Sequence, residues 1–521
     1  MLHLQNQMKQ ILPALLLLLP FLSRGQSPLS SGFFNYQLTD RYEILSDSMT
    51  TDFFTGIKPY RRDYVAAFAS KLSVHKKADS FNQNYLLLDN IIFANNPEQF
   101  SQKSILRYFY PNQRALFYVN EDRFKLVMNP LLGFAGGKDK YDSSTTYRNS
   151  RGVELFGNIG NKVGFYSYAL ENQTRFPSFL SEKYENNGTV TGATQAKEYK
   201  KGSKDFFNVA GHVTASPIQE ITVQFGHDKN FIGNGYRSLL LSDNSFNYPH
   251  LKLSFKSKNS KWLYQSIYST LIDLKRIEAT TSSEPQFYRK FGAFHFIHFI
   301  PNSKLSFGLF EGVIYQRQTV EGTLKFNANY LNPVLGFNSL FNGFNKAKTN
   351  NLIGFLANYS PFKSVLLYHQ SAIGALDNNG FGLQNGIRIM NPFKIKNLEV
   401  LVEYNVAGSS LYQQQTGVEY SHYNQQLAFV PINRKTELVV QGYYMFHYFF
   451  ISGQYNLQSW YGLNRTYLSG NFGYLINPKT GLKISVGFQQ RINISYFPLS
   501  SKSNWGFINF SSSLGQRYYD F

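Results

Sequence analysis

No cysteine occurs among the 521 residues of the chain. This absence excludes a disulfide framework, a thiol nucleophile, a cysteine-ligated metal site and the acylated cysteine of a lipoprotein. Carboxylates are scarce as well: 32 Asp and Glu residues stand against 52 Lys and Arg residues, which gives a formal charge of +20. In an exported protein this excess favours an anionic polysaccharide or lipopolysaccharide as partner over nucleic acid. Charge spread over solvated loops is the alternative interpretation.

Long apolar runs are absent apart from one near the start of the chain, Ile11–Leu22. It has about 12 residues where a membrane-spanning helix needs ~20, and Pro13 and Pro20 interrupt it. A basic residue precedes the run and small residues follow it, a pattern that predicts a secretory signal peptide over residues 1–25. We therefore expect the chain to be exported by the Sec route.

Aromatic residues are abundant at 17%, mostly as 48 Phe and 37 Tyr. Together with the scarcity of carboxylates, this composition is unusual for a soluble chain and typical of tilted strands with one face in lipid and one in water. From about Arg123 onward, apolar and polar residues alternate with period two, in pairs of segments separated by turn residues. The pattern predicts an all-β fold: a transmembrane antiparallel barrel of about eighteen strands over residues 113–521.

The connections between these segments alternate between short and long. Short turns are expected at Gly160-Asn161, Ser216-Pro217, Lys258-Asn259, Pro301-Asn302 and near Met445. The long connections are Pro177–Ser203, Lys229–Tyr248, Leu274–Gln286, Thr319–Asn350 and Ser409–Lys435. Short periplasmic turns and longer outer loops are the asymmetry of a bacterial outer-membrane barrel.

The two ends of the mature chain differ from the strand region. Residues 26–112 show helical periodicity, in "KPYRRDYVAAFASKL" after Pro59, in "DSFNQNYLLLDNIIFANN" from Asp79 and in "TDRYEILSDS" from Thr39. They are expected to form a small periplasmic helical segment or a plug. At the other end, "GQRYYDF" places Phe521 on the same face of an expected strand as Tyr519, an ending that resembles the signal read by the barrel-assembly machinery.

One stretch, "HDKNFIGNGYRSLLLSDNSFNYPHLKL" from His227 to Leu253, could hold a functional site. Its Gly233 and Gly235 are not followed by a helical run before Pro249, so a phosphate loop is not expected. Ser242 and Asp243 with His227 or His250 supply the residue types of a hydrolase, but no Gly-x-Ser-x-Gly elbow accompanies them. No metal site is expected either, because His295 and His298 lie three apart on a strand and point to opposite faces.

The stretch fits a sugar-binding loop better, since aromatic rings cover apolar sugar faces and amides bind hydroxyls. A loop that folds inward and packs the barrel mouth is the alternative, and the two are compatible. The candidate polysaccharide-binding residues are Lys229, Asn230, Asn234, Tyr236, Arg237, Asp243 and Asn244. Asp243 and Asn244 are expected to hold the loop through local hydrogen bonds.

The same stretch closely resembles the signature of the Wzi-type capsule-assembly family: a Gly-rich turn, the run "LLLSDN", then a proline and an apolar strand. Further segments resemble the Bacteroidota branch, which includes outer-membrane proteins linked to gliding motility. They are "YLNPV" at Tyr330–Val334, "LEVLVEYN" at Leu398–Asn405, "YSHYNQQLA" at Tyr420–Ala428 and "HYFFISGQYN" at His447–Asn456. Phe231 and Ile232 stand where tryptophans are common in proteobacterial members, a difference that bears on which sugar is bound.

This resemblance implies an eighteen-stranded barrel with a periplasmic helical bundle, inward-folded outer loops and a non-enzymatic, lectin-like role in organising surface polysaccharide. No cofactor is expected. The partners expected are outer-membrane lipid or lipopolysaccharide, surface polysaccharide and proteins of a gliding or secretion apparatus. Two alternatives stay open: a structural component of such an apparatus, and a diffusion channel.

Overall fold

The protein is described by a computed structural model. The structure describes residues 33–72 and 115–512, together with 82, 83, 86, 514 and 520. Within these ranges there are gaps at 52, 141–144, 161, 201, 278–285, 320–321, 326–327, 345–348, 378, 413–416, 430–434, 461–462, 478–479 and 496–500. The expected signal peptide, Phe521 with Tyr519, and most of the helical pattern after Asp79 lie outside the described residues.

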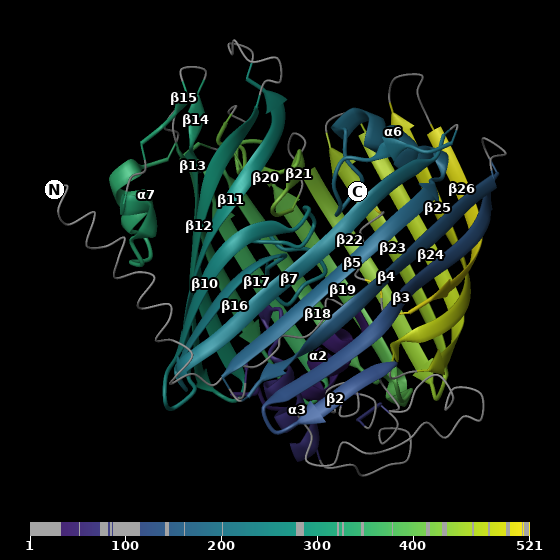
Figure 1. The fold of residues 1–521 in the computed structure, drawn as a ribbon, viewed down its shortest axis with the longest axis horizontal. Helices are drawn as coiled ribbons and strands as arrows, with labels where there is room; N and C mark the ends of the chain where they lie inside the picture. The colour runs from purple at the N-terminus through teal and green to yellow at the C-terminus, as the bar shows by residue number, and fades with distance from the viewer. Residues whose placement is uncertain are drawn as a thin grey trace.

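Eighteen long antiparallel strands close into a barrel, as the alternation of residues predicted (Figure 1). They are β3 (Phe124–Asp139), β4 (Thr145–Ile159), β5 (Val163–Arg175), β7 (Lys204–Ile218), β8 (Ile221–Asp228), β10 (Tyr248–Lys256), β11 (Trp262–Arg276), β12 (Phe287–Asn302), β13 (Leu305–Gln316), β16 (Thr349–Tyr359), β17 (Val365–Ile373), β18 (Phe381–Met390), β19 (Leu398–Ala407), β22 (Lys435–Phe446), β23 (Phe449–Trp460), β24 (Leu463–Asn477), β25 (Leu482–Ser495) and β26 (Ser501–Ser511).

The barrel closes where β26 pairs with β3, from Trp505 opposite Asp139 to Ser511 opposite Gly133. The short strand β2 (Phe117–Glu121) pairs with Phe124–Met128 of β3, a part of that strand with which β26 does not pair. Outward-facing positions are apolar and exposed, for example Phe225, Ile508 and Phe488, because that face meets lipid. Among the described residues, no helix has the length and apolar composition required to cross a membrane.

Short turns and long connections lie at opposite ends of the barrel, as predicted. Three turn positions differ from the prediction. β12 continues through Pro301 to Asn302, which pairs with Leu305 after a register shift, so the turn is at Ser303-Lys304. β7 continues through Ser216 and Pro217 to Ile218 with a register shift after Ala215, so the turn is at Gln219-Glu220. β22 continues past Met445, which pairs with Phe450, and its turn is at His447-Tyr448.

The described part of the N-terminal segment lies at the short-turn end (Figure 1). It contains α2 (Phe33–Leu45), β1 (Ile57–Lys58) and α3 (Arg62–Lys71), so helices form after Pro59 and around Thr39 as predicted. Asp40 forms ion pairs with Arg388 of β18 at 3.0 Å and with Lys58 at 3.4 Å. The segment therefore docks against the inner barrel wall.

The remaining short elements belong to the long connections or to turns. They are β6 (Lys197–Glu198), β9 (Phe231–Ile232), β14 (Gln318–Thr319), β15 (Gly322–Thr323), β20 (Ser421–His422), β21 (Gln425–Gln426), α6 (Ser178–Asn187), α7 (Phe337–Asn342), and the 3-10 helices η2 (Ala328–Leu331) and η3 (Pro392–Lys394). Helix α6 lies over the long-loop end on the side of β25 and β26 (Figure 1).

Candidate functional site

The connection between β8 and β10, residues 229–247, folds into the barrel and is called here the plug loop. Its strand β9 pairs with β1 of the N-terminal segment, Ile232 opposite Ile57. Leu239, Leu240 and Leu241 have no solvent exposure and belong to an apolar cluster with side chains of the barrel wall. The loop therefore folds inward and packs within the barrel, which is the alternative to a sugar-binding loop that the sequence left open.

The two glycines of the plug loop allow its backbone to approach the wall closely. A Cβ on Gly235 would lie 2.2 Å from Glu403 Oε2. At Gly233 the backbone has φ +146°, a conformation that other residues rarely adopt, and a Cβ would lie 2.3 Å from Gln370 Nε2. The Gly-x-Gly pattern therefore serves packing against wall side chains.

Arg237 is the main charged anchor of the plug loop. Its guanidinium forms ion pairs with Glu437 of β22 and with Asp520, both at 2.9 Å, and it is 1% exposed. Glu403 of β19 accepts hydrogen bonds from the backbone N–H groups of Tyr236 at 2.7 Å and Arg237 at 3.1 Å. A buried charge needs such partners, so the loop is fixed in one position.

The other candidate residues lie in or beside the same core. Tyr236 donates its hydroxyl to Asp520 at 3.0 Å, and Asn244 donates to the carbonyl of Ala428 at 3.0 Å. Lys229 and Asp243 are half-buried and joined through the Asp243 carbonyl, which accepts from Lys229 Nζ at 3.0 Å.

The remaining two candidate residues are Asn230 and Asn234. Asn230 accepts from Lys252 Nζ at 3.1 Å and donates to the Tyr248 hydroxyl at 3.4 Å. Asn234 donates to Thr55 Oγ1 at 3.4 Å. Five of the seven candidates (Asn230, Asn234, Tyr236, Arg237 and Asn244) are thus nearly inaccessible to solvent. Pro249, in contrast, is exposed on β10.

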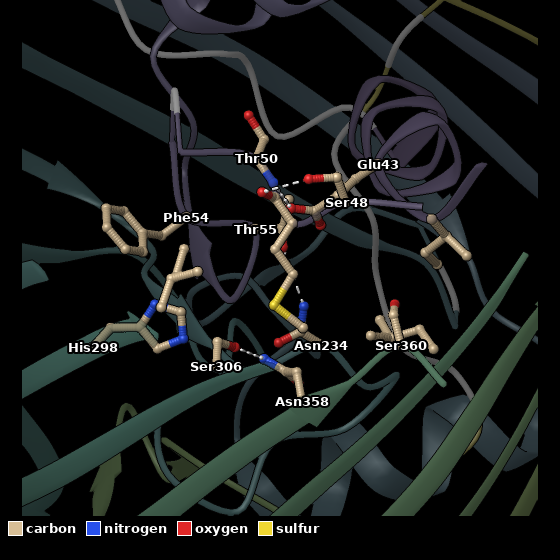
Figure 2. Close-up of a pocket in the computed structure, with 14 residues that line it drawn as sticks. Glu43, Ser48, Thr50, Phe54, Thr55, Asn234, His298, Ser306, Asn358 and Ser360 are labelled. Atoms are coloured by element: carbon tan, nitrogen blue, oxygen red, sulfur yellow. Dashed lines mark hydrogen bonds between the residues drawn. The ribbon is translucent and has the colours of Figure 1, made fainter. Parts of the chain in front are cut away.

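Asn234 also lines a small cavity where the plug loop, the N-terminal segment and the barrel wall meet (Figure 2). The cavity holds about 20 Å³ and is lined by Glu43, Thr55, His298 and Asn358 among others. That volume accommodates about one or two water molecules, too few for a sugar ring. The junction is therefore a packed joint rather than a polysaccharide site.

The residue types of a hydrolase are present but not assembled. Ser242 Oγ is buried and has no hydrogen-bond partner among the described residues, so no histidine is placed to activate it. His250 instead contacts Gln224 and the carbonyl of Tyr248. His298 faces the lumen beside Phe54, and His295 contacts Tyr264 on the other side of β12, so the two point to opposite faces as predicted. No cluster of three or more His, Asp or Glu side chains suited to a metal occurs in the described ranges.

A second polar region lies at the long-loop end and escaped the analysis of the sequence. It comprises Lys435, Arg465 and Arg491 on the inner face of β22, β24 and β25, with Lys183 of α6, and is called here the mouth cluster. Arg465 pairs with Asn493 in the register and Tyr467 with Arg491, so the two arginines are diagonal neighbours on one face. They are 26 positions apart in the sequence, and only the register brings them together.

Aromatic and backbone groups hold these cations in place. The Arg465 guanidinium lies 4.7 Å from the ring centroid of Trp460, and Lys435 Nζ lies 5.6 Å from the same centroid. Arg491 donates to the carbonyl of Phe179 in α6 at 3.4 Å, and its buried Nε has no hydrogen-bond partner within the described part of the chain.

Positive charge exceeds negative charge in the mouth cluster. Among the described residues, no carboxylate lies within ion-pair distance of Lys435, Arg465 or Arg491. Glu182 of α6 is exposed and attracts the two arginines from beyond that distance. Burial, and then the charge of Arg491, lowers the pKa of the Lys183 amine well below its usual range. Two nearby carboxylates, Glu437 and Asp520, are already paired with Arg237. The arrangement can accept an anionic group.

Comparison with known proteins shows which solved structures have a similar fold. Neither a protein-family model nor a curated protein sequence matches the chain. The structure is similar to Wzi, an outer membrane protein involved in group 1 capsule assembly in Escherichia coli and a carbohydrate-binding β-barrel, with a TM-score of 0.57 and 10% identity over 95% of this chain and 100% of that one. The chain therefore has an outer-membrane β-barrel fold similar to that of Wzi.

Two other solved barrels are more distant. OccK3 of Pseudomonas aeruginosa matches with a TM-score of 0.42 and 11% identity over 74% of this chain and 95% of that one. OccAB2 of Acinetobacter baumannii matches with a TM-score of 0.41 and 10% identity over 74% and 97%.

Proposed function

We propose that this protein is a non-enzymatic outer-membrane barrel that binds an anionic surface polysaccharide at its outer mouth. The observation that carries the proposal is the mouth cluster, in which three inward-facing cations lie close together with no carboxylate within ion-pair distance among the described residues. The plug loop has a different role in this proposal: it closes the lumen beneath the site. The signal peptide and the insertion by the barrel-assembly machinery are part of the same proposal.

The charge arrangement supports an anionic ligand on energetic grounds. Two guanidinium groups on neighbouring strands repel each other, and partial burial strengthens the repulsion because the local dielectric is lower than that of water. A carboxylate placed between them relieves it and accepts charge-assisted hydrogen bonds, which guanidinium groups form well with planar anions. An acidic sugar supplies such a carboxylate.

The choice of polysaccharide over other anions rests on the fold. Wzi, a neighbour with a similar fold, is a carbohydrate-binding barrel involved in capsule assembly. Membership in the Wzi-type family, and in its Bacteroidota branch with a link to gliding motility, is part of the proposal and rests on the sequence resemblance. A role as a mount for gliding or secretion proteins is the competing proposal.

The test is a binding titration of the purified full-length barrel with a uronic-acid oligosaccharide and a neutral oligosaccharide of equal length. The protein is expected to bind the acidic one, and R465Q/R491Q to lose at least about tenfold in affinity, since each charge-assisted bond contributes ~1.5–3 kcal/mol. The control K258Q/K261Q removes the same charge from exposed lysines at the short-turn end and is expected to bind normally. Equal binding of both sugars, or by both double variants, would contradict the proposal.

Deleting the gene and staining the cell surface separates the competing proposal. Loss of the polysaccharide coat supports binding or anchoring of polysaccharide. An unchanged coat together with lost motility supports a mount for a protein apparatus.

A further inference from the structure

A groove on the outside of the barrel lies near the seam where β26 meets β3. It encloses about 330 Å³ and is lined by Lys138, Lys140, Leu468, Phe488, Gln489, Gln490, Asn504, Trp505 and Gly506. Most of these side chains face away from the lumen, because Asp139 and Ser503, which alternate with them, are buried and bonded to each other inside the mouth at 2.9 Å. The groove therefore opens toward lipid.

The register explains the shape of the groove. One row across four strands runs Gly470, Phe488, Gly506, Lys138, since Gly470 pairs with Phe488, Phe488 with Gly506 and Gly506 with Lys138. The Phe488 ring, which is 49% exposed, lies over Gly470, where an added Cβ would meet the ring at 2.5 Å, so the open channel is on the Gly506 side of the ring. A Cβ added to Gly506 would have no atom of the described residues within 4 Å, so the channel there is open.

The next row toward the long-loop end is polar. It contains Gln490 and Asn504, which pair in the register and share a hydrogen bond of 2.7 Å, and then Lys140, whose N–H donates to the carbonyl of Asn504. Lys502 is exposed two positions above Asn504. Among the described residues, no carboxylate lies within ion-pair distance of Lys138, Lys140 or Lys502.

We propose that this groove binds one outer-leaflet lipid with a phosphorylated headgroup. The polar row meets the headgroup, with Lys138, Lys140 and Lys502 opposite its phosphates and Gln490 and Asn504 bonded to its hydroxyls or amides. An acyl chain lies in the channel beside Phe488 and Gly506. Charge and depth agree with this occupant, because the cations lie at the outer ends of β3 and β26 and the apolar channel lies deeper in the lipid-facing wall.

Such a lipid covers the seam of the barrel. β26 pairs with β3 over seven residue pairs, whereas the neighbouring pair β25 and β26 has eleven. A lipid held by side chains of β3, β25 and β26 bridges this shorter ladder from outside. This role is independent of polysaccharide binding inside the mouth, so either can fail without the other.

Native mass spectrometry of the full-length barrel in detergent, with bis-phosphorylated lipid A added, tests the proposal. The wild type is expected to retain one lipid, and dephosphorylated lipid A to bind at least about tenfold more weakly, because several surface lysines together strengthen the binding of an anionic lipid. K138Q/K140Q is expected to show a similar loss, and the control K258Q/K261Q no loss.

A second variant tests the acyl channel without changing charge. Gly506→Leu fills the channel and is expected to weaken retention by at least about tenfold, the loss of several buried methylenes. Gly442→Leu is the matched control, since Gly442 lies in a strand and a Cβ there also meets no atom within 4 Å. Binding of lipid A that is unaffected by K138Q/K140Q and by G506L, or weakened equally by G442L, would overturn the proposal.

Discussion

Arg237 in the plug loop forms an ion pair with Asp520, 283 positions later in the sequence, inside the barrel. Asp520 lies beyond the end of β26 at Ser511 and outside any strand. It also accepts hydrogen bonds from Gln454 and Asn456 of β23 at 2.7 and 2.6 Å. The end of the chain therefore takes part in fixing the plug loop to the wall.

This ion pair predicts that Arg237→Ala loosens the plug loop. The substitution leaves Glu437 and Asp520 buried without their cation, a change that costs ~3–5 kcal/mol. In planar bilayers the wild-type barrel is expected to show no steady ionic current, and the variant intermittent current as the loop leaves the lumen. Lys258→Ala, at an exposed turn, is the control. Steady current through the wild-type barrel would instead favour a diffusion channel.

The close approach of the plug loop to the wall predicts a second effect. Gly235→Ala puts a methyl group against Glu403 Oε2 and the carbonyl of Arg237. The Glu403 carboxylate is then forced away from the backbone N–H groups of Tyr236 and Arg237, which donate hydrogen bonds to it. Overpacking of this kind costs ~1–3 kcal/mol. The temperature at which the barrel unfolds in detergent is expected to fall. It is measured by heating samples to a series of temperatures and comparing the gel mobility of the folded and unfolded barrel. Gly136→Ala, where a Cβ meets nothing within 4 Å, is expected to leave it unchanged.

Docking of the N-terminal segment is expected to depend on pH through Glu43 of α2. Burial raises the pKa of this carboxyl to about 7 from an ordinary value of 4.5, although Thr55 and the N–H of Thr50 bond to it. The folded state thus binds a proton that the undocked segment releases between pH 4.5 and 7. The contribution of Glu43 to the stability of the docked segment is fully present below pH 4.5 and is lost as the pH rises through 7.

Hydrogen exchange of residues 33–45 measures this dependence. Protection of α2 is expected to be greater at pH 5.5 than at pH 8.5, and Glu43→Gln, which stays neutral, is expected to remove most of the difference. Equal pH dependence in the wild type and the variant would assign the effect to another group.

Much of the fold was predictable because the strand signal is local. Alternation from about Arg123 and the lengths of the connections predicted eighteen strands, and both agree with the structure. Turn positions were less predictable where no Gly or Pro decides them, as near Met445, or where a bulge carries a proline through the strand, as at Pro217 and Pro301. Only tertiary pairing fixes such positions.

The candidate site was predictable as a stretch but not in its surroundings. The resemblance singled out residues 227–253, and the composition allowed either a sugar-binding or an inward-packed loop. The partners of Arg237, namely Glu437 and Asp520, lie hundreds of residues away, and no local pattern joins them. Arg465 and Arg491 were missed for the same reason, since the register of β24 and β25 has to be known before they become neighbours.

The most direct test of the central claim is an experimental structure of the barrel with an acidic oligosaccharide bound. The account predicts sugar density beneath α6, with a carboxylate within hydrogen-bond distance of Arg465 or Arg491, and an unchanged plug loop below it. Density confined to the outer surface of the loops, or in the lumen in place of the plug loop beside Arg237, would contradict it.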